Sequence, residues 1–297
     1  MEMSQYILSA CSPADLTREH FEKRDIKFIS FHLTLGGKPY IDDLGLSISS
    51  ADFYRAMVDG AETQTSQVNV DEYTNYFEQY LKEGKDVLHC TLSSGISGSF
   101  NSAMVAANDL KEKYPDRKLI IVDSLCASSG YGLFMDKLAD LRDEGMSIDE
   151  LGAWAEENRK YLNHWFFSTD LTFYIKGGRV SKVSGFVGSV LGICPVLNVN
   201  NEGKLIPRIK ARGKKKAYRV VVDRMLELAD KGRNYSDKVY ISNSACYEDA
   251  RVVADMIEET FPMIKGKVEI YDIGTTIGAH TGPGTVALFF WGKEREA

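Results

Sequence analysis

Four short segments combine small residues with side chains that can donate hydrogen bonds. They lie at 65–67 (Thr-Ser-Gln), 93–99 (Ser-Ser-Gly-Ile-Ser-Gly-Ser), 176–182 (Lys-Gly-Gly-Arg-Val-Ser-Lys) and 278–284 (Gly-Ala-His-Thr-Gly-Pro-Gly). Hydroxyl, imidazole and guanidinium groups can surround an anion because each of them can donate a hydrogen bond to it. Segments of this composition could therefore recognise an acidic group, or they could simply turn the chain and cap helices.

The segment at 93–99 follows an expected strand at 87–92 and precedes an expected helix. Apolar residues recur at spacings of three and four from Ile96 onward, which is typical of a helix face. A loop at the carboxyl end of a parallel strand offers the free N–H groups and positive dipole end of the next helix, and Ser97 adds a hydroxyl. This segment is the strongest candidate for an anion site.

Ser97 also allows a catalytic interpretation. Residues 95–99 approach the nucleophile-elbow pattern G-x-S-x-G, but Ser99 stands in place of the final glycine. A serine and a histidine could act together on an acyl group, with His280 as the base. The sequence assigns no carboxylate to orient that histidine. The alternative function is therefore a Ser-His acyl hydrolase or transferase acting on a lipid ester.

A basic stretch follows in the second half of the chain. Residues 204–219 hold eight lysines and arginines and no acid, whereas the whole chain has a net charge of −6. The stretch suggests an anionic partner, or else the solvated face of a hairpin and a helix. The acidic balance of the whole chain argues against sequence-independent nucleic-acid binding, so we expect no nucleic-acid partner.

Composition indicates a globular protein whose cysteines remain in the reduced, thiol form. The chain has 297 residues, of which 44% are apolar and 26% charged. Its five cysteines are widely spaced without a C-x-x-C pair, so we expect neither disulfides nor a metal site. No basic residue precedes the first apolar stretch, which argues against a signal peptide. We therefore expect a cytoplasmic protein.

The longest notable uncharged run covers residues 183–201 and is broken by glycines and by Pro195. This pattern predicts a buried helix followed by a strand rather than a membrane span, so we expect no stable membrane insertion.

Strands and helices alternate in the first half of the chain, which predicts a parallel sheet with crossover helices. Capping patterns at Asn69–Glu72 and Ser147–Glu150 mark two helix starts. The second half predicts a mixed α+β arrangement. Its expected elements are strands at 165–167, 194–199, 205–209, 239–241, 268–273 and 285–291, and helices at 217–229 and 248–260. We place an N-terminal α/β domain at 1–160 and a C-terminal α+β domain at 161–297.

In this order, the four segments resemble motifs of the DegV family of bacterial fatty-acid-binding proteins. Family members carry T-S-Q-P, S-S-G-L-S-G-(T/S)-(Y/F), G-G-R-(I/V)-S-K and A-H-T-G-x-G. The corresponding stretches here are 65–68, 93–100, 177–182 and 279–284. Residues 211–217 also resemble the basic segment of the family.

The resemblance implies a two-domain α/β protein that holds one long-chain fatty acid between its domains, with the tail in an apolar tunnel. The carboxylate would be held by Thr65, Ser97 and His280. The ligand-binding positions together with their motif neighbours are Thr65, Ser66, Ser97, Gly98, His280 and Thr281. We expect residues 183–197 to form part of the tunnel wall. Each buried methylene contributes roughly 0.8 kcal/mol, so the tail should supply most of the affinity and the polar groups the orientation.

The resemblance also implies a partner. Related proteins present the acyl carboxylate to a separate acyl kinase, which makes acyl phosphate for phospholipid synthesis, and Arg179 occupies the position associated with kinase docking. This chain would then be a carrier without catalysis or cofactor of its own.

Two departures from the family pattern fall in loops beside the expected pocket, so the resemblance does not fix the geometry of those loops. The D-S-T-(A/S)-D-L motif begins here with Cys11 instead of aspartate, and Val68-Asn69 replaces Pro-Ser after T-S-Q. They could indicate a changed ligand, or a member that binds lipid without serving a kinase.

Overall fold

The computed structural model describes residues 6–180, 192–264 and 266–297. Its first half is built on a four-stranded sheet in the order β2-β1-β6-β7, in which every neighbouring pair is parallel. The strands are β1 (Tyr6–Cys11), β2 (Ile26–Ile29), β6 (Asp86–Thr91) and β7 (Leu119–Asp123). The parallel sheet expected from the alternating pattern is confirmed.

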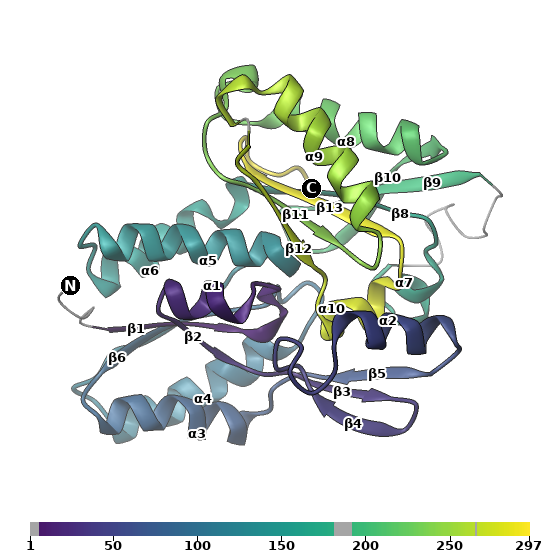
Figure 1. The fold of residues 1–297 in the computed structure, drawn as a ribbon. Coiled ribbons are helices and arrows are strands. Elements are labelled where there is room, and N and C mark those ends of the chain that lie inside the picture. Colours follow the sequence, from purple (N-terminus) through teal and green to yellow (C-terminus); the bar gives the residue numbers. More distant parts are fainter. Residues whose placement is uncertain (1–5, 181–191, 265) are drawn as a thin grey trace.

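Helices cover both faces of this parallel sheet (Figure 1). On one face lie α3 (Val70–Lys82) and α4 (Ser99–Lys113); on the other lie α1 (Arg18–Lys23), α5 (Ser128–Asp143) and α6 (Ile148–Asn158). Both predicted capping boxes are present, with Asn69 and Glu72 starting α3 and Ser147 and Glu150 starting α6. Asn69 stands where the family motif has serine. It caps the helix all the same, because asparagine and serine are both favourable N-cap residues.

A second, six-stranded sheet forms the core of the other half, in the order β10-β9-β8-β13-β11-β12. All its pairs are antiparallel except β11 with β12, so the sheet is mixed, as predicted. The strands are β8 (Leu162–Ser168), β9 (Ile193–Val199), β10 (Leu205–Arg212), β11 (Val239–Asn243), β12 (Val268–Asp272) and β13 (Thr285–Trp291). The two-part α/β fold class is confirmed, whereas a domain boundary at residue 160 stays a prediction.

The mixed sheet lies between two helical layers (Figure 1). Its outer face carries α8 (Lys214–Leu228) and α9 (Tyr247–Thr260), and α5 packs on its inner face against β8, β11 and β13. Because α5 also lies over the parallel sheet, it is buried over most of its length. The strand expected in the second part of the uncharged run is β9. The helix expected in its first part falls on residues 183–191, outside the described part of the chain.

A small antiparallel sheet in the order β4-β3-β5 joins the two halves and has no counterpart in the sequence-based predictions. It consists of β3 (His32–Leu35), β4 (Lys38–Ile41) and β5 (Thr63–Ser66), with α2 (Ser50–Val58) between the last two strands. The remaining helical segments are η1 (Ser12–Ala14), η2 (Arg159–Tyr161), α7 (Thr172–Lys176), η3 (Gly232–Asn234), η4 (Pro262–Ile264) and α10 (Thr275–Thr281). Within the described residues, no helix combines the length and apolar composition needed to cross a bilayer.

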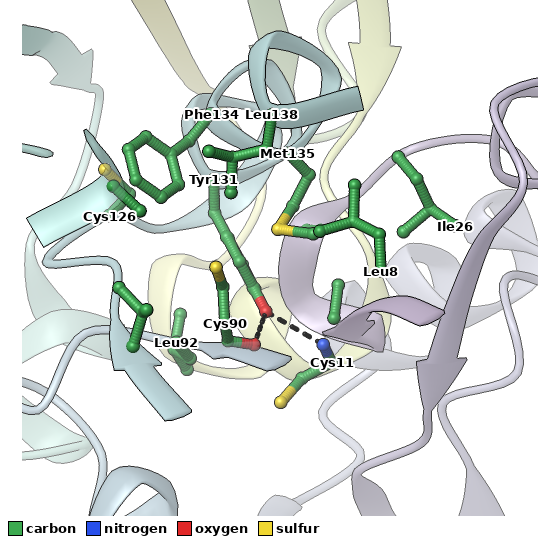
Figure 2. Packing of buried hydrophobic residues seen from close by; sticks show 14 of the residues in the cluster. Leu8, Cys11, Ile26, Cys90, Leu92, Cys126, Tyr131, Phe134, Met135 and Leu138 are labelled. Carbon is green, nitrogen blue, oxygen red and sulfur yellow. Dashed lines mark hydrogen bonds between the residues drawn. The ribbon is translucent and has the colours of Figure 1, made fainter. Parts of the chain in front are cut away.

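Tyr131, a buried residue of α5, forms hydrogen bonds with two strands of the parallel sheet (Figure 2). Its hydroxyl accepts a hydrogen bond from the Cys11 backbone N–H at 2.9 Å and donates one to the Cys90 carbonyl. The Cys11 thiol is fully buried, 3.2 Å from the Tyr73 hydroxyl, and burial raises its pKa. The side chain that departs from the family pattern is therefore a neutral core residue, and all five cysteines are free.

Candidate functional site

A cavity of about 310 Å³ lies between the parallel and the mixed sheets, and residues from both halves of the chain line it. Apolar and polar residues contribute to its wall in nearly equal numbers, but most of the wall surface is apolar. The apolar lining residues are Phe31, Leu92, Ile96, Ala127, Phe166, Tyr174, Val199, Leu205, Ile273, Ile277, Ala287 and Phe289. The polar lining residues are Thr65, Ser66, Gln67, Ser97, Ser128, His164, Arg179, Thr276, His280, Thr281 and Thr285.

All four sequence-selected segments reach this cavity. Thr65, Ser97 and His280 line it together, and the Thr65 hydroxyl lies 2.8 Å from Nε2 of His280. Of their motif neighbours, Ser66 and Thr281 also line the cavity. Gly98 is absent from the lining and serves instead as the N-cap of α4.

The alternation of β5 directs Thr65 toward the cavity. Successive side chains of a strand point to opposite faces, so Thr63 and Thr65 share one face. That face lies against α10, where the Thr63 hydroxyl reaches the Ala279 carbonyl at 3.4 Å and Thr65 meets His280. The strand contains no apolar residue, and its register is set by pairing with β3, where Leu33 lies opposite Thr65.

Ser97 lies in a tight turn before α4 rather than within the helix. The N–H groups of Ile96 and Ser97 both bond to the Ser93 carbonyl, and the helix begins only at Ser99. Ile96, expected to start the helical face, lines the cavity instead. The Ser97 hydroxyl oxygen accepts the Ser99 N–H at 3.2 Å, which leaves its hydrogen able to donate to a ligand.

Gly98 allows the first two segments to approach each other closely. A Cβ at this position would come within 2.8 Å of Oε1 of Gln67. The Gln67 amide is in turn anchored by donating to the Ser102 hydroxyl at 3.1 Å. The Thr-Ser-Gln strand therefore packs directly against the start of α4, and this contact places Thr65 and Ser97 in the wall of the same cavity.

His280 is carried by α10, a short helix with no strong helix-forming sequence. Its threonines and glycine have modest intrinsic helix propensity. Tertiary contacts support its first turn, since the Thr275 and Thr276 hydroxyls donate to the buried Asp42 carboxyl group at 3.0 and 2.6 Å. Burial raises the pKa of that carboxyl group.

The electrostatics of the cavity keep His280 neutral. Burial, followed by the nearby positive charge of Arg179, lowers the pKa of His280 to about 4. Its Nδ1 atom is buried without a hydrogen-bond partner among the described residues. This atom packs against the backbone of Gly177, where a Cβ would collide with it. The glycine of the third segment therefore makes room for the histidine of the fourth.

Arg179 lies at the edge of the cavity and joins the second and third segments. Its Nε atom donates to the Ile96 carbonyl at 3.3 Å and its Nη1 atom donates to the Gly177 carbonyl. Burial lowers the pKa of its guanidinium. The end of this motif, residues 181 and 182, lies outside the described part of the chain.

The arrangement suits anion recognition better than acyl hydrolysis. In the described part of the chain, no hydrogen bond joins Ser97 to His280, and no carboxylate contacts the buried Nδ1 atom of His280. A serine nucleophile needs a base within hydrogen-bond reach and a group that orients that base. Thr65 and Ser97 can instead donate to an acid, while the apolar wall can cover a hydrocarbon chain.

The basic stretch is partly neutralised by local contacts. Lys204 pairs with Glu202 at 2.6 Å, and Lys214 pairs with Asp249 at 2.6 Å. The Arg208 guanidinium donates to the Asn198 side chain at 2.9 Å.

Among the residues that the structure describes, no group of three or more acidic, histidine or cysteine side chains is arranged to hold a metal ion.

Several cavity residues have no pattern in the sequence that marks them. Phe31 precedes β3, and Ile273 and Ile277 lie around the start of α10. Single apolar residues such as these are common in any core. They become wall residues only through the way the small sheet and α10 meet, and nothing short of the assembled fold could have identified them.

The chain is similar to known proteins over nearly its whole length. A family model described as "DegV: Uncharacterised protein, DegV family" matches residues 11–293. A DegV domain-containing protein of Clostridium perfringens is 36% identical over 99% of this chain and 100% of its own length. One from Lactococcus lactis is 31% identical over 94% of each chain.

Solved structures share the fold. A DegV lipid-binding protein of Thermotoga maritima has a TM-score of 0.82 at 26% identity, covering 98% of this chain and 100% of that one. A fatty-acid-binding DegV protein of Thermus thermophilus has a TM-score of 0.84 at 24% identity, over 97% and 100% of the chains. The fatty acid kinase B3 protein of Streptococcus pneumoniae, loaded with linoleic acid, has a TM-score of 0.80 at 22% identity, over 98% and 100%.

Proposed function

Since this chain belongs to the DegV family, we propose that it binds one long-chain fatty acid in the 310 Å³ cavity. Thr65, Ser97 and His280 hold the carboxylate, and the apolar wall covers the tail. The observation that carries this proposal is the 2.8 Å contact between Thr65 and His280 within a cavity that Ser97 also lines. Fatty-acid binding by solved proteins of the same fold supports it.

The hydrogen-bond inventory supports a carboxylate as the bound acid. A buried charge is costly unless several donors reach it. In our proposal, Nε2–H of His280 donates to the Thr65 oxygen, which frees the Thr65 hydrogen for the ligand. The Ser97 hydrogen is the second donor, because the Ser97 oxygen already accepts the Ser99 N–H. Ser66 and Thr281 complete the surrounding wall.

The tail supplies most of the affinity in this proposal. Burial of each methylene contributes roughly 0.8 kcal/mol, so a long acyl chain contributes on the order of 10 kcal/mol before the costs of association. The cavity walls come from both halves of the chain, which supports a two-domain arrangement, 1–160 and 161–297, with the ligand between the domains.

We further propose that the chain presents its fatty acid to a separate acyl kinase and does not itself catalyse phosphorylation. The likeness to a fatty acid kinase B3 protein supports a partner of this kind. Arg179 is the residue proposed to serve the kinase, because it lies where the carboxylate site meets the outside of the cavity.

The decisive experiment is ligand identification. The purified 297-residue chain is denatured and extracted with organic solvent, and the extract is analysed by mass spectrometry. We expect about one long-chain fatty acid per chain, and saturable rebinding after the lipid is removed. Finding no fatty acid, together with no binding of added hexadecanoate or octadecenoate, would contradict the proposal. Turnover of an acyl ester that disappears in Ser97→Ala would instead support a hydrolase.

A further inference from the structure

Ser99, the first residue of α4, is held by hydrogen bonds on two sides. Its backbone N–H donates to the Ser97 hydroxyl oxygen at 3.2 Å, and its own hydroxyl lies 2.6 Å from the hydroxyl of Tyr73. Ser99 and Tyr73 are fully buried, whereas Ser97 is partly exposed and lines the cavity. A short chain of hydrogen bonds therefore leads from the core to one of the hydroxyls proposed to bind the carboxylate.

The ring of Tyr73 is fixed by aromatic neighbours. It stacks on Phe77 of the same helix, with ring centroids 5.3 Å apart and an angle of 17° between the ring planes. His89 of β6 meets the ring edge to face, with centroids 5.4 Å apart. Both neighbours are fully buried, and side chains in a close-packed core have little room to shift. The Tyr73 hydroxyl is therefore held beside Ser99.

The Tyr73 hydroxyl has two partners of unequal strength. Oγ of Ser99 lies 2.6 Å from it and Sγ of Cys11 lies 3.2 Å from it. Burial raises the pKa of both the Cys11 thiol and the Tyr73 phenol, so both groups stay neutral. A neutral thiol is a weak donor and a weak acceptor. The bond with Ser99 is consequently the stronger of the two.

The Tyr73–Ser99 bond joins two helices that each follow a segment of the site. Helix α3 begins at Val70, shortly after the strand that carries Thr65, and Tyr73 lies in its first turn. Helix α4 begins at Ser99, directly after the turn that carries Ser97. A bond between the starts of these helices sets the position of the Ser97 turn relative to Thr65.

From these contacts we infer that Tyr73 is a positioning residue for the bound carboxylate, acting through Ser99 on the hydroxyl of Ser97. The inference rests on the proposed function, because Ser97 must donate to the acid. The Ser99 N–H engages the Ser97 oxygen, and this bond limits the orientations in which the Ser97 hydrogen can reach the ligand. When Tyr73 no longer holds Ser99, the Ser97 donor must be ordered by the ligand itself, at a cost in affinity.

The test is a double-mutant cycle between Tyr73 and Ser97 in the delipidated 297-residue chain, with dissociation constants for hexadecanoate measured by calorimetry. We expect Tyr73→Phe to weaken hexadecanoate about three- to tenfold, and to change its affinity by less than about twofold in the Ser97→Ala background. A loss that persists in full in that background would overturn the inference, because a general packing defect does not require the Ser97 hydroxyl.

Two further variants sharpen the test. Ser99→Ala removes the same bond from its other end and should cause a similar loss, and the Tyr73→Phe/Ser99→Ala pair should bind no more weakly than either single variant. Tyr76→Phe is the matched control, since it removes a phenol hydroxyl of the same helix that lies 2.7 Å from Oγ of Ser9. Equal losses in Tyr73→Phe and Tyr76→Phe, or fully additive losses at positions 73 and 99, would contradict the inference.

A measurement without ligand separates this inference from the proposed function. NMR follows hydrogen exchange of the Ser99 amide, whose acceptor is the Ser97 oxygen. Exchange should accelerate at least about threefold in Tyr73→Phe and stay unchanged in Tyr76→Phe, because only the first substitution loosens the start of α4. Unchanged exchange in Tyr73→Phe would overturn the positioning role even if fatty acid binds. The expected exchange in a chain that does not bind hexadecanoate would instead overturn the proposed function.

Discussion

The hydroxyl of Thr65 lies 2.8 Å from Nε2 of His280, although the two residues are 215 positions apart in the chain. One comes from an edge strand of the small sheet and the other from the last turn of a short helix. Neither segment is a site by itself. Their contact creates a polar corner in a largely apolar cavity, and the predictions below depend on that corner or on the elements that hold it.

Removing the Thr65 hydroxyl should weaken fatty-acid binding. A hydrogen bond to a charged group contributes about 1.5–3 kcal/mol, so Thr65→Val should raise the dissociation constant for hexadecanoate by about ten- to hundredfold. Thr65→Ser retains the hydroxyl and should stay close to the unmodified chain. Thr63→Val alters the same face of β5 without touching His280 and serves as the control. Equal effects at positions 63 and 65 would contradict the assignment.

The ionisation of His280 should report ligand binding. Its pKa is about 4 in the ligand-free fold, below the ordinary value of 6.5. A bound carboxylate favours the imidazolium, so hexadecanoate should raise this pKa, which NMR titration of the His280 ring protons can measure. An unchanged pKa at saturating ligand would mean that the carboxylate binds elsewhere.

The same depressed pKa fixes a pH dependence of stability. The unfolded chain binds this proton more tightly than the fold does, so the contribution of neutral His280 is complete above pH 6.5 and is lost as the pH falls toward 4. One such group changes the free energy of unfolding by up to about 1.4 kcal/mol per pH unit. In the ligand-free chain, His280→Gln should make the urea-unfolding profile less steep across this window. A slope unchanged by the substitution would contradict a histidine held neutral by the fold.

Filling the apolar wall should change the preferred chain length. Ala287 lines the cavity from β13, and leucine at this position would occupy space that the tail needs. Each methylene that loses its place should cost about fourfold in affinity, which corresponds to 0.8 kcal/mol. Ala287→Leu should therefore weaken octadecenoate more than decanoate, and decanoate serves as the internal control. Equal losses for both acids would argue that the tail does not pass this residue.

Arg179→Ala should impair phosphorylation more than it impairs fatty-acid binding. The guanidinium bonds to backbone carbonyls of two site segments, and Arg179 lines both the cavity and a neighbouring hollow that Gly178 and Pro207 also line. With a cognate kinase, we expect the rate to fall at least about tenfold, because a charged contact is lost, and the dissociation constant for the acid to change less. Kinase kinetics identical to those of the unmodified chain would remove Arg179 from this role.

Tyr131→Phe should destabilise the fold. The substitution leaves the buried Cys11 N–H without its 2.9 Å acceptor and the Cys90 carbonyl without a donor. An unsatisfied buried polar group costs about 1–3 kcal/mol, measurable by urea unfolding. Tyr161→Phe, at a side chain that is 40% exposed, should stay within about 0.5 kcal/mol of the unmodified chain. Similar losses in both variants would show that the two Tyr131 hydrogen bonds do not carry the difference.

Local patterns in the sequence were sufficient for much of the fold. The capping boxes at Asn69 and Ser147 form where they were expected, because a cap depends on residues three positions apart. The parallel and mixed sheets follow from alternating apolar strands and amphipathic helices. The small sheet was missed because β5 has no apolar residue and exists only through its pairing with β3.

The sequence by itself determined which side chains could meet an anion: the hydroxyls of Thr65 and Ser97, the imidazole of His280 and the guanidinium of Arg179 all stand in short polar segments. Only the tertiary structure decided that the four line one cavity, that His280 is carried by a helix, and that Ile96 leaves its expected helix for the cavity wall. Composition and spacing act over a few residues. The distances between these groups are set by sheet pairing and packing between segments that lie far apart in the chain.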